Sequence, residues 1–449
     1  MKIVIVGAGE VGFQIAEQLI AENKDVVIIE QDSERVKYAS NHLDCIVLQA
    51  EGNNIEILKE AGISKADYFI SVTNSDEVNM IACGLVSSEF ERPYKIARVR
   101  NLDYSRAKIF EKSFLGIDCI VNPEVEAAKV IANTVEYGAS SDIMLFEKTD
   151  IQMRNIFIDE HSQLKNRALK DIKKSLKEDF LIGCISRQEN IIIPSGKTII
   201  RENDNVYLFA TKKKLEEVFA KVGRSKTEIK NVIIVGGGRI GKYVAAYLIK
   251  QKRNVKIIDS NTRNCIELAE DFPEALVING DISDEDIFED EQLHSYDLII
   301  TTTNNQELNI LAAIYAKTLG IKRAIPIVTK TNYLTIASNL GIDATISPKN
   351  SSVDTILKVI RKGNIKTIHS IFGGKAEVIE FSLENSSFEN GKAIKELKIP
   401  ENTLIVSVSR GRDNYIPGGD FVIQNGDDII IITPQESISK VEDIFTSHQ

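Results

Sequence analysis

The residues of this chain with the clearest chemistry are the glycines of a Gly-x-Gly-x-x-Gly pattern. Gly7, Gly9 and Gly12 come directly after the strand-forming segment Lys2 to Val6, whose last four residues are apolar. Gly7 permits a tight turn, Gly9 lets a pyrophosphate approach the backbone, and Gly12 lets the next helix pack closely on the sheet. The amide groups at the start of that helix, around Glu10 and Val11, then face an anion. The pattern predicts a phosphate-binding loop.

An acidic residue follows at the distance typical of a dinucleotide-binding fold. Glu30 ends a second apolar strand, Val26 to Ile29. A carboxylate at this place can accept hydrogen bonds from both ribose hydroxyls of an adenosine. We call the glycines Gly7, Gly9 and Gly12 together with Glu30 site one.

The same unit occurs a second time, and we call it site two. It consists of Gly236, Gly238, Arg239, Ile240, Gly241 and Asp259. Gly236 lies 229 residues after Gly7. Asp259 lies the same distance after Glu30. Three fixed glycines recur by chance about 0.1 times in a chain of this composition, so one motif alone would be weak. Two motifs and two acids at one offset predict a duplicated dinucleotide-type fold.

Short apolar strands alternate with helices around both motifs, which favours parallel sheets covered on both faces. The predicted class is α/β, with two doubly wound parallel-sheet (Rossmann-like) N lobes. Each is followed by a small α+β C lobe without a phosphate loop. In the C lobes we predict helices over Leu164 to Leu176 and Ile394 to Leu397, and an acidic turn before the last strand. The predicted domains are an N lobe at 1–137, a C lobe at 138–222, a linker at 223–230, an N lobe at 231–367 and a C lobe at 368–449.

Polar residues follow the fourth strand of each N lobe, where ligands of open sheets bind. In the first lobe these are Thr73 and Asn74, and in the second Thr303 and Asn304. Asn74 has two interpretations that the sequence leaves open. It contacts the ligand or a neighbouring subunit, or it caps the helix that begins at Asp76.

Charged residues differ between the two copies. Arg239 is placed to pair with a β- or γ-phosphate, or else is a solvated surface residue. Its counterpart Glu10 puts a negative charge where a triphosphate would lie. Arg98 and Arg100 on the fifth strand have no cationic counterparts in the second copy. One of them is expected to reach the phosphates of site one, with a salt bridge at a subunit interface as the competing role.

Composition limits the classes of function. The chain of 449 residues has a net charge of −10 and no long basic run, so nucleic acid is an unexpected partner. No apolar run approaches the roughly 20 residues that span a bilayer, and the first strand leaves no room for a signal peptide. Five scattered Cys and five His have no metal-ligand spacing, so no metal site is predicted. The acidic pairs Asp76–Glu77 and Asp427–Asp428 are interpreted as solvated turns rather than cation sites.

These motifs resemble those of the TrkA family, the regulatory subunits of bacterial Trk potassium uptake, which consist of tandem RCK (regulating K⁺ conductance) units. The resemblance covers essentially the whole chain. It rests on both glycine motifs, the two acids, and the segments Thr73 to Asn79, Ala97 to Asn101 and Asn279 to Asp281.

The resemblance implies a protein that is not an enzyme and that binds NAD(H) and adenine nucleotides such as ATP or ADP. It implies N lobes assembled into a ring, a homo-oligomer of four chains, and docking on a membrane potassium-translocating subunit of the TrkH/TrkG type. The implied location is cytoplasmic, peripheral on the inner face of the plasma membrane. Asp281 matches the family residue that meets the adenine edge, whereas the first copy has Gln49-Ala-Glu51 there.

From these differences we expect unequal sites, with NAD(H) favoured in site one and an adenine nucleotide in site two. No catalytic set accompanies the loops, so no catalytic residue is predicted. Two alternatives remain open at this point: an NAD-dependent oxidoreductase, and a nucleotide sensor of another transporter.

Overall fold

The computed structural model describes the chain except for residues 102–103, 105–113, 137–142, 147–148, 189, 223–228, 285, 361–364, 372–375, 384–390, 412 and 446–449. Contacts divide it into two compact units. The first contains residues 1–128 and 347–361, and the second contains 129–346 and 362–449.

The first unit is built on a six-stranded parallel sheet in the order β3-β2-β1-β4-β5-β6. Its strands are β1 (Lys2–Val6), β2 (Asp25–Glu30), β3 (Ile46–Gln49), β4 (Tyr68–Ser71), β5 (Tyr94–Arg98) and β6 (Cys119–Val121). Its helices include α1 (Glu10–Ala21), α2 (Ser33–His42), α3 (Ile55–Glu60) and α4 (Asp76–Glu89). The strand order reverses between β1 and β4, so a crevice for a ligand is expected outside the carboxyl ends of these strands. The predicted doubly wound class is confirmed.

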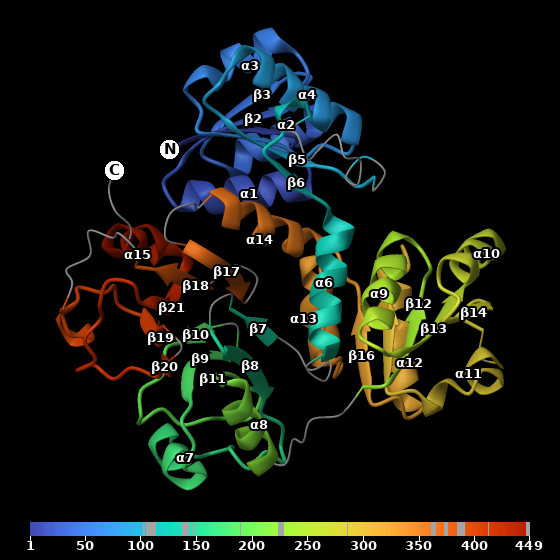
Figure 1. Ribbon diagram of the computed structural model, residues 1–449, viewed down its shortest axis with the longest axis vertical. Coiled ribbons are helices and arrows are strands. Elements are labelled where there is room, and N and C mark those ends of the chain that lie inside the picture. The colour runs from blue at the N-terminus through green and yellow to red at the C-terminus, as the bar shows by residue number, and fades with distance from the viewer. Residues whose placement is uncertain are drawn as a thin grey trace. The chain divides into compact units, whose positions relative to one another are not determined.

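A helix from the far end of the chain completes this unit. α14 (Pro348–Ile360) lies against α1, as Figure 1 shows in orange and blue. Val353, Ile356 and Leu357 are fully buried in the same apolar cluster as Ile15 of α1. The Tyr68 hydroxyl also donates to the backbone oxygen of α14 residue 359. The sheet of the first N lobe is therefore covered on one face partly by the last helix of the second N-lobe segment.

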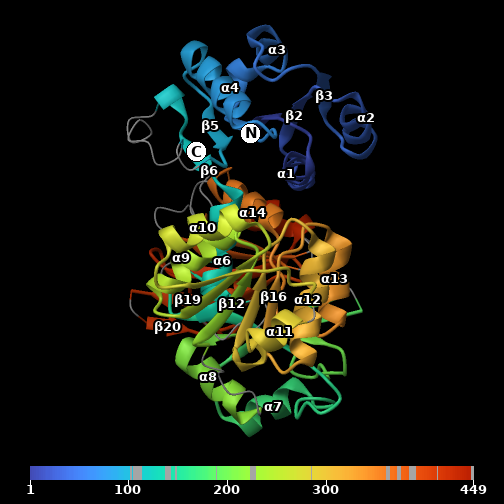
Figure 2. The same cartoon turned by 90° about the vertical axis from the view of Figure 1, so that its right-hand side faces the viewer.

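The second unit contains a matching sheet in the order β14-β13-β12-β15-β16. Its strands are β12 (Asn231–Val235), β13 (Asn254–Asp259), β14 (Leu276–Asn279), β15 (Leu298–Thr301) and β16 (Arg323–Pro326). A single parallel bridge between Ile327 and Ile346 takes the place of a sixth strand. Figure 2 shows this sheet between two helical layers. The helices are α9 (Arg239–Lys250), α10 (Thr262–Asp271), α11 (Asp286–Asp290), α12 (Gln306–Thr318) and α13 (Thr331–Asn339).

Helix α6 (Pro123–Glu136) is the counterpart of α14. It begins in the first unit and ends in the second. Its last turns carry the buried Ile131 and Val135, and Gln251 at the end of α9 donates to the Ala132 carbonyl. Each N lobe thus contributes its last helix, wholly or in part, to the other unit.

The second unit also holds both C lobes, which share one antiparallel topology, β10-β9-β11-β8-β7 and β17-β18-β21-β19-β20. The strands are β7 (Ile143–Leu145), β8 (Ile151–Phe157), β9 (Leu181–Arg187), β10 (Asn190–Ile192), β11 (Asn205–Thr211), β17 (Ile365–Ile371), β18 (Ala376–Ser382), β19 (Leu404–Arg410), β20 (Asp413–Tyr415) and β21 (Asp428–Pro434). The helices are α7 (Leu169–Leu176), α8 (Lys212–Lys221) and α15 (Ile438–Phe445). One apolar cluster contains residues of both sheets, among them Met153, Phe209, Val378 and Ile432.

Two helix predictions in the C lobes need correction. The helix expected from Leu164 begins only at Leu169, because Asn166 has a positive φ of 60°, which a helix interior does not allow. The expected helix from Ile394 is a single 3-10 turn, Ile394–Glu396. The acidic turns have a structural role. The Asp204 carboxylate is held by Arg187, and that of Asp427 by Arg410, each through two hydrogen bonds of 2.7–2.8 Å.

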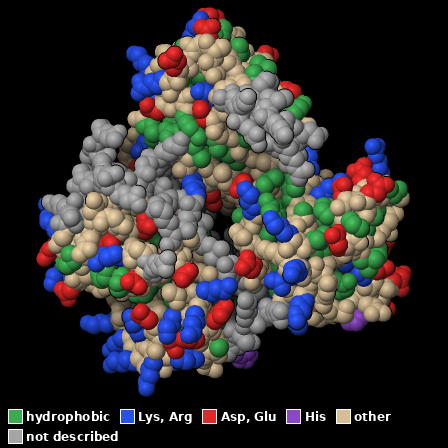
Figure 3. Space-filling view, in the orientation of Figure 1, with side chains coloured by type: hydrophobic (Ala, Val, Ile, Leu, Met, Phe, Trp, Pro, Cys, Tyr) green, Lys and Arg blue, Asp and Glu red, His purple; other side chains and the backbone are tan. Residues whose placement is uncertain are grey.

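Charge is unevenly distributed over the second unit. Lysines gather on and beside α7, where Figure 3 shows blue side chains along the lower edge. They are Lys170, Lys173, Lys174, Lys177 and Lys197, all exposed. Although the net charge of the chain is negative, the first C lobe therefore has a local positive surface. Within the described residues, every helix is too short or too polar to cross a lipid bilayer.

Candidate nucleotide-binding sites

Two of the three glycines in each loop are required by the fold itself. Gly7 and Gly236 have φ values of 101° and 98°, a region that favours glycine. A Cβ atom on Gly12 would lie 1.9 Å from the Gly7 carbonyl oxygen, and one on Gly241 would lie 2.0 Å from that of Gly236. The first glycine therefore makes the turn, and the third allows helix and strand to approach, as predicted.

The middle glycine of each loop has no such structural reason. Gly9 and Gly238 have φ values of −67° and −66°, which any residue adopts. A Cβ atom on Gly9 would have only the Arg35 Nη1 atom within 4 Å, at 3.6 Å, and one on Gly238 would meet nothing. The space above both backbones is open. The residues present therefore fit a bound pyrophosphate, which needs this close approach to the chain.

Helices α1 and α9 begin at these glycines without a side-chain cap. The first amide groups of a helix have no partner within it, so their N–H groups and the helix dipole attract an anion. Val11 is buried in the core, so it offers a ligand only its backbone. Ile240 is half-buried, and Glu10 and Arg239 are exposed at the first helical position of each site.

The two acids hold the phosphate loop in place. The Glu30 Oε2 atom accepts from the Ala8 amide at 2.7 Å, and Oε1 accepts from the Asp32 amide at 2.9 Å. Asp259 repeats this arrangement with the amides of Gly237 at 2.6 Å and Asn261 at 2.8 Å. Because a carboxylate has about four acceptor positions, each acid can still accept from ribose hydroxyls.

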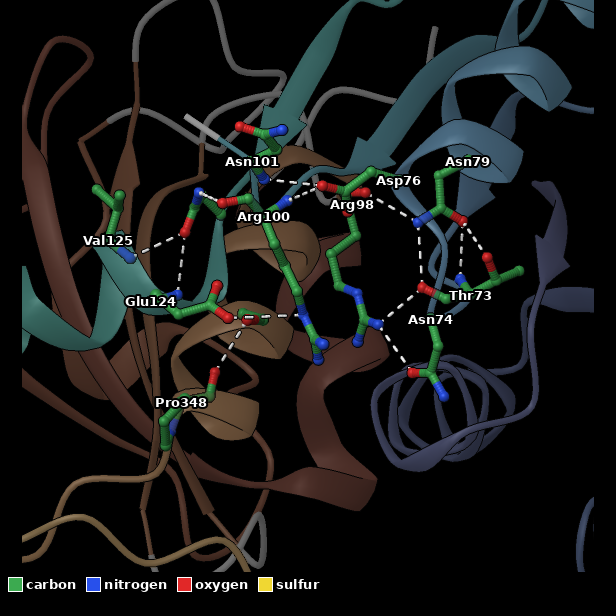
Figure 4. A network of polar contacts seen from close by, with 12 residues as sticks. Thr73, Asn74, Asp76, Asn79, Arg98, Arg100, Asn101, Glu124, Val125 and Pro348 are labelled. Atoms are coloured by element: carbon green, nitrogen blue, oxygen red, sulfur yellow. Dashed lines mark hydrogen bonds and ion pairs between the residues drawn. The ribbon is translucent and has the colours of Figure 1, made fainter. Parts of the chain in front are cut away.

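Asn79 fixes the loop between β4 and α4, a role that the sequence did not predict (Figure 4). Its Oδ1 atom accepts from the Thr73 amide and hydroxyl, both at 2.8 Å, and from Ser71 Oγ at 3.0 Å. Its Nδ2 atom donates to the carbonyls of Thr73 and Arg98. Asn79 is fully buried, so these bonds satisfy an otherwise costly amide.

Asn309 repeats this arrangement in the second N lobe. It bonds the amide, hydroxyl and carbonyl of Thr303 and the carbonyl of Ile327. The signal for this role was present in the sequence as two Asn residues, 79 and 309, which lie 230 residues apart, one more than the offset of the glycine motifs.

Arg98 and Arg100 have different surroundings, although they are only two residues apart (Figure 4). The Arg98 guanidinium is buried, and its Nη2 atom donates to the Thr73 carbonyl at 2.7 Å and to Asn74 Oδ1 at 3.1 Å. Its Nε atom has no hydrogen-bond partner among the described residues. Burial lowers the pKa of Arg98 to about 10, with a further contribution from Arg100, so it stays charged at neutral pH. Asn74 does not cap α4, because Ser75 Oγ accepts from the Val78 amide.

Arg100 points to helix α6 instead. Its Nε atom lies 3.6 Å from Glu124 Oε1, in the first turn of α6. The amides of Arg100 and Asn101 both donate to Asp76 Oδ2. Of the two arginines, Arg98 is therefore the one in contact with the loop at the ligand edge of the sheet.

Site two differs in its surroundings. Ile327 takes the place of Arg98, so no guanidinium from the fifth strand supports Thr303 and the exposed Asn304. Asp281 Oδ1 accepts from the amide and hydroxyl of Ser283, and these bonds lower the pKa of the Asp281 carboxyl. That oxygen has a local role in its turn.

The acidic pairs singled out in the sequence have protein partners. Asp76 is bonded by the amides at 100 and 101, Glu77 by Ser75 and Tyr104, and Asp427 by Arg410. Among the described residues, no group of three His, Cys, Asp or Glu is arranged to hold a metal ion. Most of the linker predicted at 223–230 lies outside the described residues.

The repeat in the structure coincides with a repeat of two family models. The TrkA-N domain matches residues 3–123 and 232–348, and the TrkA-C domain matches residues 153–223 and 378–446. The chain belongs to the TrkA family. This confirms the resemblance expected from the motifs.

Relatives extend over the whole length of this TrkA-family chain. It is 32% identical over 452 residues to Trk system potassium uptake protein TrkA homolog 1 of Methanosarcina mazei, covering 99% of this chain and all of the relative. It is 31% identical to Trk system potassium uptake protein TrkA of Halomonas elongata, covering 99% and 98%. The GsuK channel bound to NAD is similar in fold, with a TM-score of 0.58 and 17% identity over 99% of this chain and 78% of that one.

Proposed function

We propose that this chain is a regulatory subunit of a potassium uptake system that binds NAD(H) and adenine nucleotides. The observation that carries the proposal is the pair of open glycines, Gly9 and Gly238, each beside a helix start and an acid in a TrkA-family chain. The names of the family relatives support potassium uptake as the process. The NAD-bound GsuK channel supports a nicotinamide dinucleotide as a ligand.

We propose the following roles for the residues around the ligand. Gly9 leaves room for the phosphates in the turn that Gly7 and Gly12 permit, the amides of Glu10 and Val11 face them, and Glu30 accepts from the ribose. Site two repeats this with Gly236, Gly238, Arg239, Ile240, Gly241 and Asp259. The edge beyond the fourth strands is lined by Thr73, Asn74, Arg98, Thr303 and Asn304. Asp281 is the candidate adenine contact, and Arg100 is a residue that positions α6.

The sites are proposed to differ in ligand, with NAD(H) in site one and ATP or ADP in site two. Arg239 is the basis of this assignment, because an arginine at the first helical turn favours further phosphates, whereas Glu10 opposes them. Arg98 with its unpartnered Nε atom is a further donor available only beside site one.

The proposed action is binding without chemical turnover. A homotetramer would bring eight N lobes together, enough to close a ring by symmetry. The ring would dock on a membrane potassium-translocating subunit of the TrkH/TrkG type at the cytoplasmic face. A ligand would shift the equilibrium between two states of the ring by the difference in its affinity for those states. A coupling of about 1–3 kcal/mol would change the open probability about 5- to 150-fold. The division at 1–137, 138–222, 223–230, 231–367 and 368–449 remains our proposed domain plan.

Flux measurements test this function. The full chain and the membrane subunit encoded with it are reconstituted in vesicles, and rubidium uptake is measured with NADH, ATP or no nucleotide. A nucleotide-dependent change that is lost in a Gly9→Asp, Gly238→Asp double variant supports the proposal. Binding of nucleotide without any change in flux would favour a sensor of another transporter. Oxidation of NADH by the chain with a small substrate would favour the oxidoreductase alternative.

A further inference from the structure

Site one has an arginine at its phosphate loop that comes from a different helix than the arginine of site two. Arg35 of α2 directs its guanidinium towards Gly9, with Nη1 3.6 Å from the place of a Cβ atom there. Counting 229 residues on, the second copy has Asn264 at this position. Position 10 shows the reverse substitution, with glutamate in site one and Arg239 in site two. Each site thus has one arginine beside its glycine loop, but it comes from the second helix of the lobe in site one and from the first helix in site two.

The local structure holds Arg35 in this place. Asp32 caps α2, and its Oδ1 atom accepts from the amides of Glu34 and Arg35 at 2.9 and 3.0 Å. The amide of Asp32 is in turn bonded to Glu30, the acid of site one. The start of α2 is therefore fixed relative to the ribose-binding acid and, through the Ala8 amide, to the phosphate loop.

The guanidinium of Arg35 is available to a ligand. Among the described residues it makes no hydrogen bond or ion pair, although carboxylates are plentiful on this exposed turn. In α10, by contrast, Arg263 is paired with Glu267 at 3.4 Å. A guanidinium has a planar fork of donors that matches two phosphate oxygens. It lies beside the one glycine of the loop whose missing side chain the fold does not require.

Together these observations say which phosphates site one accepts. The positive charge reaches the loop from the α2 side, next to the ribose acid. Glu10 on the α1 side places a negative charge where a chain of further phosphates would extend. The diphosphate that bridges the two nucleosides of a dinucleotide would lie near Arg35, and it would place no further phosphate charge near Glu10.

We propose that Arg35 is the phosphate-binding residue of site one and selects the bridging diphosphate of a dinucleotide. This deepens the proposed function and rests on it. Arg35 acts as a specificity residue: the Glu30 carboxylate recognises the ribose, the open Gly9 admits the diphosphate, and Arg35 neutralises it.

Binding of NADH to the full chain by calorimetry tests the assignment. All variants carry Gly238→Asp, which blocks site two, so only site one is measured. Arg35→Ala should weaken NADH about 10- to 100-fold, the loss expected for a hydrogen bond to a charged group. Arg35→Lys should recover part of the affinity, and the salt dependence of binding should decrease in Arg35→Ala. Arg263→Ala, an exposed arginine of α10, is the matched control and should bind NADH unchanged. Thermal unfolding of each variant checks that the fold is intact.

Two further arms separate the possible failures. Glu10→Arg should raise the affinity of site one for ATP at least tenfold, because it supplies the charge that site two has. If Arg35→Ala binds NADH as the parent does, the inference is wrong while the proposed function stands. If Arg35→Ala loses NADPH but not NADH, the arginine recognises a ribose 2′-phosphate, and the assignment to the bridging diphosphate is overturned. If the parent chain binds no nucleotide at all, it is the proposed function that fails.

Discussion

Glu30 Oε2 accepts a hydrogen bond from the Ala8 amide at 2.7 Å, so the acid that we propose to bind the ribose is joined directly to the glycine loop. The same carboxylate is bonded to the start of α2 through the Asp32 amide. One side chain thereby holds both the glycine loop and the start of α2. Asp259 does the same in the second N lobe.

We predict that Glu30→Gln weakens NADH binding at site one at least tenfold and lowers stability by about 1–3 kcal/mol. The amide nitrogen of Gln cannot accept from one of the two backbone amides, which leaves a buried donor unpaired. Calorimetry and urea unfolding measure the two effects. The matched variant Asp259→Asn should affect site two and leave site one unchanged. Equal NADH affinity in Glu30→Gln and the parent chain would contradict the role of the acid.

Two glycine-to-alanine variants three residues apart should behave in opposite ways. Gly12→Ala is expected to destabilise the fold by about 3 kcal/mol or more, because its Cβ would lie 1.9 Å from the Gly7 carbonyl. Gly9→Ala should change stability by less than about 1 kcal/mol, because the added methyl has open space and an allowed φ. Yet Gly9→Ala should lose most NADH affinity, since the methyl fills the path of the pyrophosphate.

Thermal unfolding and calorimetry on the same preparations test both variants. Gly238→Ala repeats the comparison in site two. A Gly9→Ala variant that keeps full affinity would show that the open space does not hold the phosphates.

The first half of the chain should not fold as a unit when it is produced alone. A chain of residues 1–230 lacks α14, so the apolar side of α1 around Ile15 and Leu19 is exposed to water. We expect aggregation or self-association, which light scattering detects. Co-production with residues 231–449 should restore a soluble complex, because the second half supplies α14. A monodisperse, stable monomer from residues 1–230 alone would contradict the observed packing.

Stability should depend on pH through Glu178 of the first C lobe. Hydrogen bonds from Lys214 and then Lys221 lower the pKa of the Glu178 carboxyl from 4.5 to about 2. The unfolded chain binds this proton more readily, so the contribution is fully present above about pH 4.5. It is lost as the pH falls through about 2.

Urea unfolding of the parent chain and Glu178→Gln at pH 6 and at pH 3 measures this contribution. The difference between the two proteins should be larger at pH 6. Glu202→Gln, in a more exposed pair with Lys165, is the control and should show a smaller difference. An equal difference at both pH values for Glu178→Gln would exclude the linkage.

The sequence predicted those features that depend on neighbouring residues. The turn at Gly7, the close packing at Gly12 and the acid at Glu30 all follow from short-range spacing, and the structure has them. The contacts of Asn79 and the approach of Arg35 to Gly9 could not be predicted, since each depends on which segments the folded chain brings together. Asn79 bonds a carbonyl of the next strand, and Arg35 reaches a loop that lies 26 residues earlier, near Gly9.

Which of Arg98 and Arg100 contacts the loop at the ligand edge could also not be predicted from the sequence. Both lie on or just after one strand, and their surroundings are set by α4 and α6, respectively. Likewise, the pattern of α14 predicts an apolar face, but nothing in the pattern says which sheet that face covers. Periodicity identifies the elements, whereas the partners of each element are decided by the whole chain.

The exchange of α6 and α14 has a consequence for how such a molecule can be made. Two separate polypeptides that complete one another in this way would have to be synthesised in equal amounts, and any excess of one would be left with uncovered apolar surface. Joining them in a single gene product sets the ratio at one to one in every cell. The fused arrangement thereby lets the two proposed nucleotide sites differ in sequence while both remain in one molecule.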